Sequence, residues 1–364
     1  MSRVLDDSLL DDPVRLAAVD GEAGGLLRAA ASAGAQVRST AELAAESAVG
    51  ELRGFRPRAV VLVDRPGVGP AVHQLLVALL GPDCPVPVVV SEAAPAWAGP
   101  LDVVIAHTDD PGDMRLAESI NRAGRRGARV VLTAPVDGPV AAAAAGTCVL
   151  LPERVPVPAG FAFPRALTAG LVSLDALGLL RTSIDVLADE LDREAEQNHA
   201  GYESFVNPAK SLALRLGDRT PLVCGLDPVA TAVAGHAVDA LAGFAGVVAG
   251  AADYAQVRTR MVLHRAAVRA TSGDDIFADP DESPGGLLRT VLLAVATDAG
   301  AEAAQRAATH LLPGADLLAP GEETKGGLAV RAAVLALRFE LTAVYLGLAT
   351  GALDGPGRHA SLAV

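Results

Sequence analysis

The chain has 364 residues, of which 51% are hydrophobic and only 3% aromatic, and its 43 acidic and 30 basic side chains give a formal net charge of −13. A single core rarely grows beyond about 250 to 300 residues, so the length predicts two domains, and a core of Ala, Val and Leu favours helices packed on a sheet. The negative charge excludes nucleic acids and anionic membranes as the main partners.

The N-terminal segment carries acidic side chains where a signal peptide needs positive charge and an apolar segment. The apolar stretches at residues 140–145 and 240–252 are too short for the helix of about 20 residues that spans a bilayer. Cys84, Cys148 and Cys224 are odd in number and lie in or beside apolar runs, which favours buried thiols over a disulfide or a metal site. We therefore expect a cytoplasmic protein without a membrane segment, a metal or a cofactor.

After two helices, the first half of the chain predicts an alternation of short strands and helices. The apolar, β-branched runs are continuous, which is typical of parallel strands covered on both faces. Crossover helices between them complete the pattern of a parallel sheet. The predicted helices are 26–33, 40–49, 71–80 and 114–126, and the predicted strands are 59–63, 86–90, 103–106, 130–133 and 148–151.

Four prolines between residues 152 and 164 predict an extended, irregular segment. A second alternation follows, interrupted at residues 270–286 by an acidic, Gly- and Pro-containing stretch that predicts an exposed loop. Its elements are helices 165–180, 183–197 and 208–216, strand 222–224, a helix from 229, strand 290–296, helix 301–312, strand 315–318 and helix 328–350. We predict an α/β fold with N-terminal helices and a first sheet domain in residues 1–160, connecting helices in 161–206, and a second sheet domain in 207–364.

Three segments resemble the bifunctional phosphoglucose/phosphomannose isomerases, which are built from two sugar isomerase (SIS) domains. Residues 207–213, NPAKSLA, with the strand after them, are similar to the start of the second domain of that family. Residues 163–167, FPRAL, resemble its Pro-Arg motif, and residues 338–346, RFELTAVYL, resemble its closing helix. The resemblance implies two pseudo-duplicated SIS-type domains, a sugar phosphate or related carbohydrate as ligand, and a homodimer, with this chain a divergent member of actinobacterial type.

The chemistry of that family indicates which residues to examine. Its members bind a sugar 6-phosphate, open the ring, and move a proton between C1 and C2 through an enediolate. This requires phosphate-binding hydroxyl and N–H groups, an acid/base for ring opening, a carboxylate base and a cation. Arg165 matches the cation that stabilises the enediolate, and Thr108 keeps one phosphate-binding hydroxyl. Asn207 and Lys210 also match, although a helix cap and a surface ion pair are alternative roles for them.

The phosphate-binding turns depart from the family pattern. In the first turn, between Gly67 and Gly69, Val68 replaces the phosphate-binding Ser. In the second loop, Asp110 and Asp113 stand where the family has hydroxyls. Each contact of like charges at ~4 Å costs about 4 kcal/mol at an effective dielectric constant of ~20. An acidic helix cap is one interpretation of this loop, and a divalent cation held by Asp110, Asp113 and the neighbouring Asp109 is another.

The acid and base positions are also altered. Asp239 is the only carboxylate in the helix where the family has its base, and Asp275 lies where it has the ring-opening His. His264 and Arg358 are the groups nearest to the positions of the missing His and Lys. Two hypotheses follow: a glucose-6-phosphate/mannose-6-phosphate isomerase that uses Arg165 with Asp239 or Asp275, or a non-catalytic protein that binds a sugar derivative or regulates mannose metabolism. The missing groups favour the second hypothesis, and the resemblance favours the first.

Overall fold

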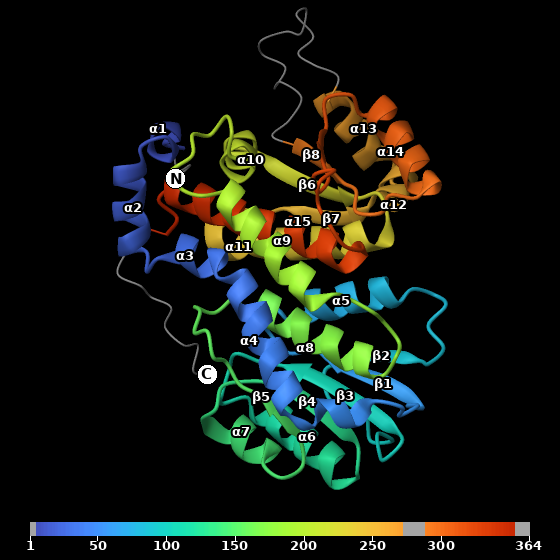
Figure 1. Cartoon of the computed structure of the whole chain (residues 1–364). Coiled ribbons are helices and arrows are strands. Elements are labelled where there is room, and N and C mark those ends of the chain that lie inside the picture. Colours follow the sequence, from blue (N-terminus) through green and yellow to red (C-terminus); the bar gives the residue numbers. More distant parts are fainter. Residues whose placement is uncertain (1–4, 272–287, 354–364) are drawn as a thin grey trace, which may run out of the picture. The chain divides into compact units, whose positions relative to one another are not determined.

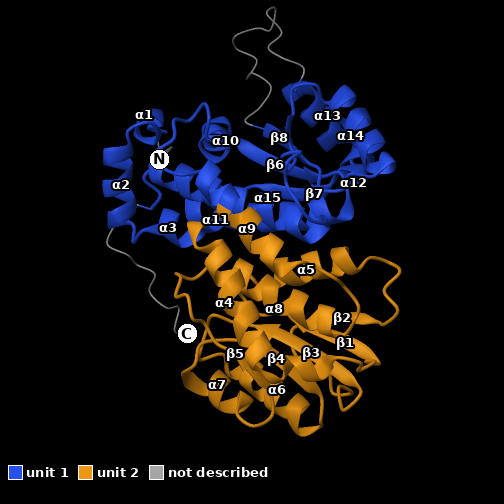
Figure 2. Cartoon of the chain, in the orientation of Figure 1, with its two compact units in different colours: residues 1–30, 193–358 blue, residues 31–192, 359–364 orange. Residues whose placement is uncertain are grey.

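The computed structural model describes residues 5–271 and 288–353. The chain folds into two compact units, which are coloured in Figure 2. Unit 1 contains residues 1–30 and 193–358, and unit 2 contains residues 31–192 and 359–364. Each unit is built on one parallel sheet, so the predicted α/β class with two sheet domains is confirmed.

Unit 2 contains a five-stranded parallel sheet with the strand order β2-β1-β3-β4-β5. Its strands are β1 (Ala59–Val63), β2 (Val88–Ser91), β3 (Asp102–His107), β4 (Arg129–Thr133) and β5 (Val149–Leu151). All five were predicted, to within one or two residues at either end. The prediction succeeded because β-branched residues form continuous apolar runs wherever both faces of a strand are buried, and every residue of β1 and β3 is buried here.

Helices cover both faces of this sheet (Figure 1). One face packs against α4 (Ala33–Glu46), α5 (Gly69–Leu80) and α8 (Phe163–Ala176), and the other against α6 (Met114–Arg125) and α7 (Gly138–Ala144). A Cβ atom at Gly170 of α8 would lie 2.4 Å from a methyl carbon of Leu76 on α5, so glycine allows these two helices to approach closely. The unit also contains the 3-10 helix η1 (Ala48–Leu52) and most of α9 (Ile184–Gln197).

Unit 1 repeats the same topology with four strands in the order β7-β6-β8-β9. These are β6 (Thr220–Gly225), β7 (Gly250–Asp253), β8 (Leu288–Leu293) and β9 (Asp316–Leu318), and their order corresponds to β2-β1-β3-β4 of unit 2. The predicted duplication is therefore visible in the strand order. Strand β7 was not predicted, because its sequence Gly-Ala-Ala-Asp lacks the β-branched residues that mark a strand locally.

Helices α10 (Pro208–Leu216), α11 (Pro228–Ala245) and α15 (Leu328–Ala349) pack together in unit 1. Within the described residues, α11 and α15 are long and apolar enough to cross a membrane by length and composition. Their most apolar windows are 61% and 100% buried inside the protein, respectively, which is the behaviour of core helices. The remaining helices of the second half are α12 (Tyr254–Thr259), α13 (Met261–Thr271) and α14 (Ala299–Leu311).

The N-terminal helices α1 (Asp7–Leu10), α2 (Pro13–Glu22) and most of α3 (Leu26–Ala31) belong to unit 1, whereas the predicted division placed them with the first sheet. The Asp6 N–H donates to the Ala349 carbonyl at 2.9 Å, and the Lys210 ammonium donates to the Leu10 carbonyl. The observed division thus differs from the predicted segments 1–160, 161–206 and 207–364, because helix packing brings residues 1–30 to the second half of the chain. Of the predicted loop 270–286, residues after 271 lie outside the described part of the chain.

Candidate functional site

The order of strands places one candidate site at the carboxyl ends of β1 and β3 in unit 2. The chain leaves these neighbouring strands in opposite directions, toward α5 and α6 respectively. In open parallel sheets, ligands bind at such a reversal, in the crevice outside the carboxyl ends of the strands. We call this the β1–β3 crevice; its loops are residues 64–68 after β1 and residues 108–113 after β3.

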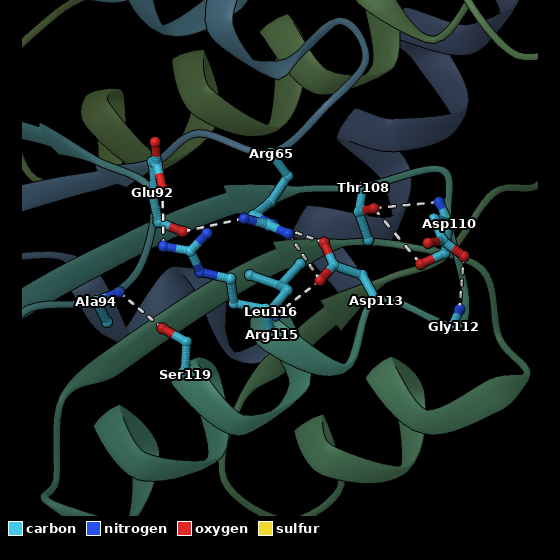
Figure 3. Close-up of polar contacts among 10 residues, drawn as sticks. All are labelled: Arg65, Glu92, Ala94, Thr108, Asp110, Gly112, Asp113, Arg115, Leu116 and Ser119. Carbon is cyan, nitrogen blue, oxygen red and sulfur yellow. Dashed lines mark hydrogen bonds and ion pairs between the residues drawn. The ribbon is translucent and has the colours of Figure 1, made fainter. Parts of the chain in front are cut away.

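An ion pair links the two loops of the crevice (Figure 3). Arg65 Nε and Nη2 donate to the two carboxylate oxygens of Asp113 at 2.6 and 3.0 Å, with both side chains largely buried. Asp113 Oδ1 also accepts a hydrogen bond from the Leu116 N–H at 2.9 Å, which caps α6. Burial raises the pKa of Asp113, but the bonds from Arg65 and the Leu116 amide outweigh this and lower it overall. The carboxylate of Asp113 therefore occupies the helix start that a phosphate would otherwise use.

The loop after β3 is closed by bonds within itself (Figure 3). Thr108 is buried, and its hydroxyl accepts from the Asp110 N–H at 3.1 Å. Asp110 is exposed, and its Oδ1 accepts from the Gly112 N–H at 2.8 Å. The Pro111 carbonyl accepts from the Val140 N–H at 3.2 Å. The one hydroxyl that matches the phosphate-binding motif is thus used to hold the turn.

Arg165 lies at the start of α8 and is held by two carboxylates. Its Nη2 donates to Asp109 at 2.5 Å and its Nη1 donates to Glu153 at 2.9 Å. The Arg165 side chain is only 4% exposed, while those of Asp109 and Glu153 are 25% and 36% exposed. Arg165 Nε is buried without a hydrogen-bond partner among the described residues. Arg165, the cation that resembles the one in the isomerase motif, is therefore present, but the carboxylates of Asp109 and Glu153 already balance its charge.

His107, the last residue of β3, extends this network into the sheet. Its Nδ1 lies 2.7 Å from Thr133 Oγ1, in register on β4, and its Nε2 lies 3.5 Å from Asp109 Oδ1. Burial lowers the pKa of His107, so the ring is neutral at pH 7. Burial raises the pKa of Asp109, but the neighbouring His107 ring and the charge and hydrogen bond of Arg165 outweigh it, and the pKa is lowered overall. Asp109 is therefore a stable carboxylate and a weak base.

Four residues of this network, His107, Arg65, His73 and Glu153, are not among the site residues predicted from the sequence. His73 on α5 lies 2.5 Å through Nδ1 from Asp64 Oδ1, directly after β1. Apart from His107 and Asp109, the partners in these contacts are between nine and 56 residues apart. Only the shared position at the carboxyl ends of parallel strands could have suggested the grouping.

The equivalent crevice of unit 1, between β6 and β8, is also filled by a carboxylate. Asp227 Oδ1 accepts from the Ala230 N–H at 2.8 Å, which caps α11. Its Oδ2 accepts from the N–H groups of Val295 and Ala296, in the loop after β8, at 2.9 and 3.1 Å. Three backbone donors converge there, as they would on an anionic ligand, and the anion is a side chain of the protein.

Asn207 and Lys210 have structural roles in unit 1. Asn207 caps α10, since its Oδ1 accepts from the Lys210 N–H at 3.0 Å. Lys210 is 1% exposed, and its ammonium donates to the carbonyls of Leu10, Ala200 and Tyr202 at 2.5 to 2.7 Å. Burial lowers the pKa of Lys210. The helix-cap alternative for Asn207 agrees with the structure, whereas the surface ion pair considered for Lys210 is wrong because the side chain is buried among carbonyl groups.

The other predicted site residues are Asp239, Asp275, Gly67 and Gly69. Asp239 is exposed on α11, and Asp275 lies outside the described residues. Gly67 adopts a φ of 115°, which favours glycine, and Gly69 is the first residue of α5, so both serve the turn after β1. Among the described residues no group of three or more His, Cys, Asp or Glu side chains could hold a metal, and Asp109, Asp110 and Asp113 each have separate partners.

No protein-family model matches the chain, and no curated protein matches it in sequence. The strand order and the carboxylate at each crevice define it as an α/β protein with two units, each built on one parallel sheet.

Solved structures share this fold over nearly the whole chain. A protein from Silicibacter pomeroyi DSS-3, provisionally described as a phosphosugar isomerase, is 16% identical with a TM-score of 0.60, over 90% of this chain and 98% of its own. Tagatose-6-phosphate ketose/aldose isomerase from Escherichia coli is 10% identical with a TM-score of 0.56, over 93% and 94%. A hypothetical protein from Thermus thermophilus is 15% identical with a TM-score of 0.65, over 96% and 92%. At these identities the likeness shows the fold alone.

Proposed function

We propose that this chain is a non-catalytic protein with the phosphosugar isomerase fold, which binds a carbohydrate derivative without converting it. The observation that carries the proposal is the state of Arg165, whose two terminal nitrogens are bonded to Asp109 and Glu153. An enediolate would have to displace at least one of these carboxylates from a largely buried guanidinium. Such a cation offers little additional stabilisation to a developing negative charge.

The charges around the β1–β3 crevice support a ligand without a phosphate. The network contains six carboxylates and three guanidinium groups, so negative charge is in excess: the acids are Asp64, Glu92, Asp109, Asp110, Asp113 and Glu153, and the bases are Arg65, Arg115 and Arg165. Repulsion from like charges at this spacing disfavours a dianion. We infer that an uncharged sugar or an amino sugar is the preferred class of ligand.

Two measurements test the two halves of this proposal. A coupled assay of fructose-6-phosphate formation from glucose-6-phosphate and mannose-6-phosphate should give no rate above background. Activity that disappears in R165A would establish the alternative, an isomerase in which Arg165 is the cation and Asp239 or Asp275 is the base to be tested next. Calorimetric titration with glucose, glucosamine and glucose-6-phosphate should detect glucosamine or glucose binding more tightly than the phosphate. Absence of binding by all three would overturn the sugar-binding half.

A gain-of-function variant tests why the phosphate is disfavoured. The substitutions D110S and D113S together restore two hydroxyls, keep a helix-capping residue at 113, and release Arg65 for an anion. The affinity for glucose-6-phosphate should rise by about tenfold or more, since one such charge contact alone is worth more than that factor. The matched control is D83S with D175S, which removes two exposed charges outside the 64–68 and 108–113 loops of unit 2. An equal rise in the control would show that net charge alone is responsible.

A homodimer and a cytoplasmic location are also proposals. The fold shared with phosphosugar isomerases is compatible with both. Sedimentation equilibrium of the full chain tests the first, and fractionation of cells tests the second.

A further inference from the structure

A cavity of about 300 Å³ lies in unit 2 at the opposite edge of the sheet from the β1–β3 crevice. It is bounded by η1 and by the amino ends of β4 and β5, and its lining residues include Ala48, Glu51, Leu52, Arg129, Cys148 and Val149. This volume is at the lower end of the range of about 300 to 1,000 Å³ that is typical of small-molecule sites. The cavity suits a compact ligand, and its residues have no part in the network around Arg165.

Arg129 is positioned to recognise a carboxylate. It begins β4, in register with Val103, and its guanidinium carbon lies 3.5 Å from the centroid of the Phe55 ring. Stacking on an aromatic ring fixes the plane of a guanidinium while leaving its N–H edge open for two parallel hydrogen bonds. In the part of the chain that the structure describes, the Arg129 side chain forms no hydrogen bond and no ion pair, in contrast to Arg65 and Arg165.

Glu51 supplies the opposite charge in the same cavity. It lies in η1, which is anchored by the buried side chains of Val49 and Leu52. Across residues 5–271 and 288–353, the Glu51 side chain also has no hydrogen-bonded or ion-paired partner. No N···O distance between Glu51 and Arg129 is as short as 4.0 Å, so the two charges share one cavity without neutralising each other directly.

The rest of the lining is uncharged. Cys148 Sγ lies 3.6 Å from Thr147 Oγ1, and burial raises the pKa of this thiol, so it remains neutral and does not compete for the guanidinium. Ala48, Leu52 and Val149 add apolar surface. The cavity therefore combines one cationic group, one anionic group and an aliphatic wall.

We propose that this cavity binds a small zwitterion, an α-amino acid with an aliphatic side chain. The carboxylate of the ligand bonds the open edge of Arg129, its ammonium group faces Glu51, and its side chain lies against Leu52 and Val149. This site is independent of the proposed sugar-binding function, because it lies at the other end of the strands.

The test is titration of the full-length, ¹⁵N-labelled protein with L-leucine, followed by NMR and by calorimetry. Amide shifts should be largest at residues 48–52, 128–131 and 146–149. The analogues 4-methylpentanoate, which lacks the ammonium group, and 3-methylbutylamine, which lacks the carboxylate, should each bind at least about tenfold more weakly, because each loses one charge-assisted contact.

Variants with matched controls separate this site from non-specific binding. R129Q and E51Q should each weaken leucine binding by about tenfold or more, whereas R125Q and E118Q, at exposed positions of α6, should leave it unchanged. All four positions are exposed, and circular dichroism verifies that the variants remain folded. The proposal is overturned if millimolar leucine shifts no amide in these three segments, or if R129Q and R125Q bind leucine equally well.

Discussion

Arg165 illustrates how one residue can match a catalytic motif while serving a structural purpose. It is buried at the start of α8 and is neutralised by Asp109 and Glu153, which lie 56 and 12 residues away in the chain. Asp113 and Asp227 act in a similar way at the two crevices, since each carboxylate satisfies helix-start N–H groups that a bound anion would satisfy. In both crevices a carboxylate of the protein thus accepts a hydrogen bond from an N–H group at a helix start.

The first prediction concerns the ion pairs of Arg165. R165M should lower the free energy of unfolding of unit 2 by about 2–4 kcal/mol, because it leaves two partly buried carboxylates without their partner. R115M is the matched control: its pair with Glu92 is exposed, and the expected loss is below about 0.5 kcal/mol. Denaturant unfolding followed by the fluorescence of Trp97, the only tryptophan, reports on unit 2. Equal losses in the two variants would contradict the structural role of Arg165.

The second prediction concerns the pH dependence of unit 2. The pKa of His107 is lowered in the folded state, so the unfolded chain takes up a proton first as the pH falls below about 6.5. The lowered pKa of Asp109 acts in the same direction at more acidic pH, since its stabilisation is lost as the pH falls through the folded-state value. Stability monitored by Trp97 should therefore decrease from pH 7.5 to about 5.5.

The substitution H107N tests the origin of this dependence. Asn at 107 keeps a polar atom near Thr133 but cannot titrate, so the slope of stability against pH should become shallower. H310N, at an exposed position of α14 in unit 1, is the control and should leave the slope measured by Trp97 unchanged. An unaltered slope in H107N would assign the pH dependence to other groups.

At the level of elements, α11 and α15 show how small residues set the packing of a core with few aromatics. A Cβ atom at Gly347 would lie 2.0 Å from the Phe244 carbonyl oxygen, so the two backbones are in close contact there. Both helices are apolar around much of their circumference because they are enclosed by other elements of unit 1. Their length and composition are similar to those of membrane helices, but burial inside unit 1 explains why they are so apolar.

The third prediction follows from this contact. G347A should destabilise unit 1 by about 1–3 kcal/mol or more through overpacking against backbone that cannot yield easily. G243A, on an exposed part of α11 with no atom within 4 Å of the added methyl group, should stabilise it by about 0.5–1 kcal/mol through helix propensity. Thermal unfolding monitored by far-ultraviolet circular dichroism measures both. A stabilised G347A would mean that α11 and α15 are less closely packed than described.

For the whole molecule, both ends of the described chain contribute to unit 1. Helices α1 and α2 contact α15, and the Lys210 ammonium bonds the Leu10 carbonyl together with two carbonyls of the segment before α10. Asp11 also accepts hydrogen bonds from the N–H and hydroxyl groups of Ser204. The N-terminal helices are therefore part of the second sheet domain and do not form a separate extension of the first.

The fourth prediction tests this assignment. Deletion of residues 1–30 should accelerate amide hydrogen exchange in α10 and α15, because Lys210 and the end of α15 lose partners. Strands β1 to β5 should exchange at nearly their original rates. The opposite pattern, with faster exchange in β1 to β5, would contradict this assignment and show that the N-terminal helices stabilise the first sheet.

The sequence by itself determined the fold class, most helices and strands in outline, and the points at which the chain departs from an isomerase. It could do so because strands buried on both faces form continuous apolar runs and because helix caps and prolines act locally. Strand β7 could not be predicted, because its residues have low strand propensity and its extended conformation depends on pairing with β6.

Only the tertiary structure decided the partners of the charged residues and the membership of residues 1–30. Arg65 and Asp113 lie 48 residues apart, and they meet because parallel strands bring their carboxyl ends to one edge. The sequence showed that Asp113 stands where the family has a hydroxyl group, and the structure showed that Arg65 neutralises its charge. An ion pair depends on the distance and burial of two groups, and neither is encoded in the local sequence around either one.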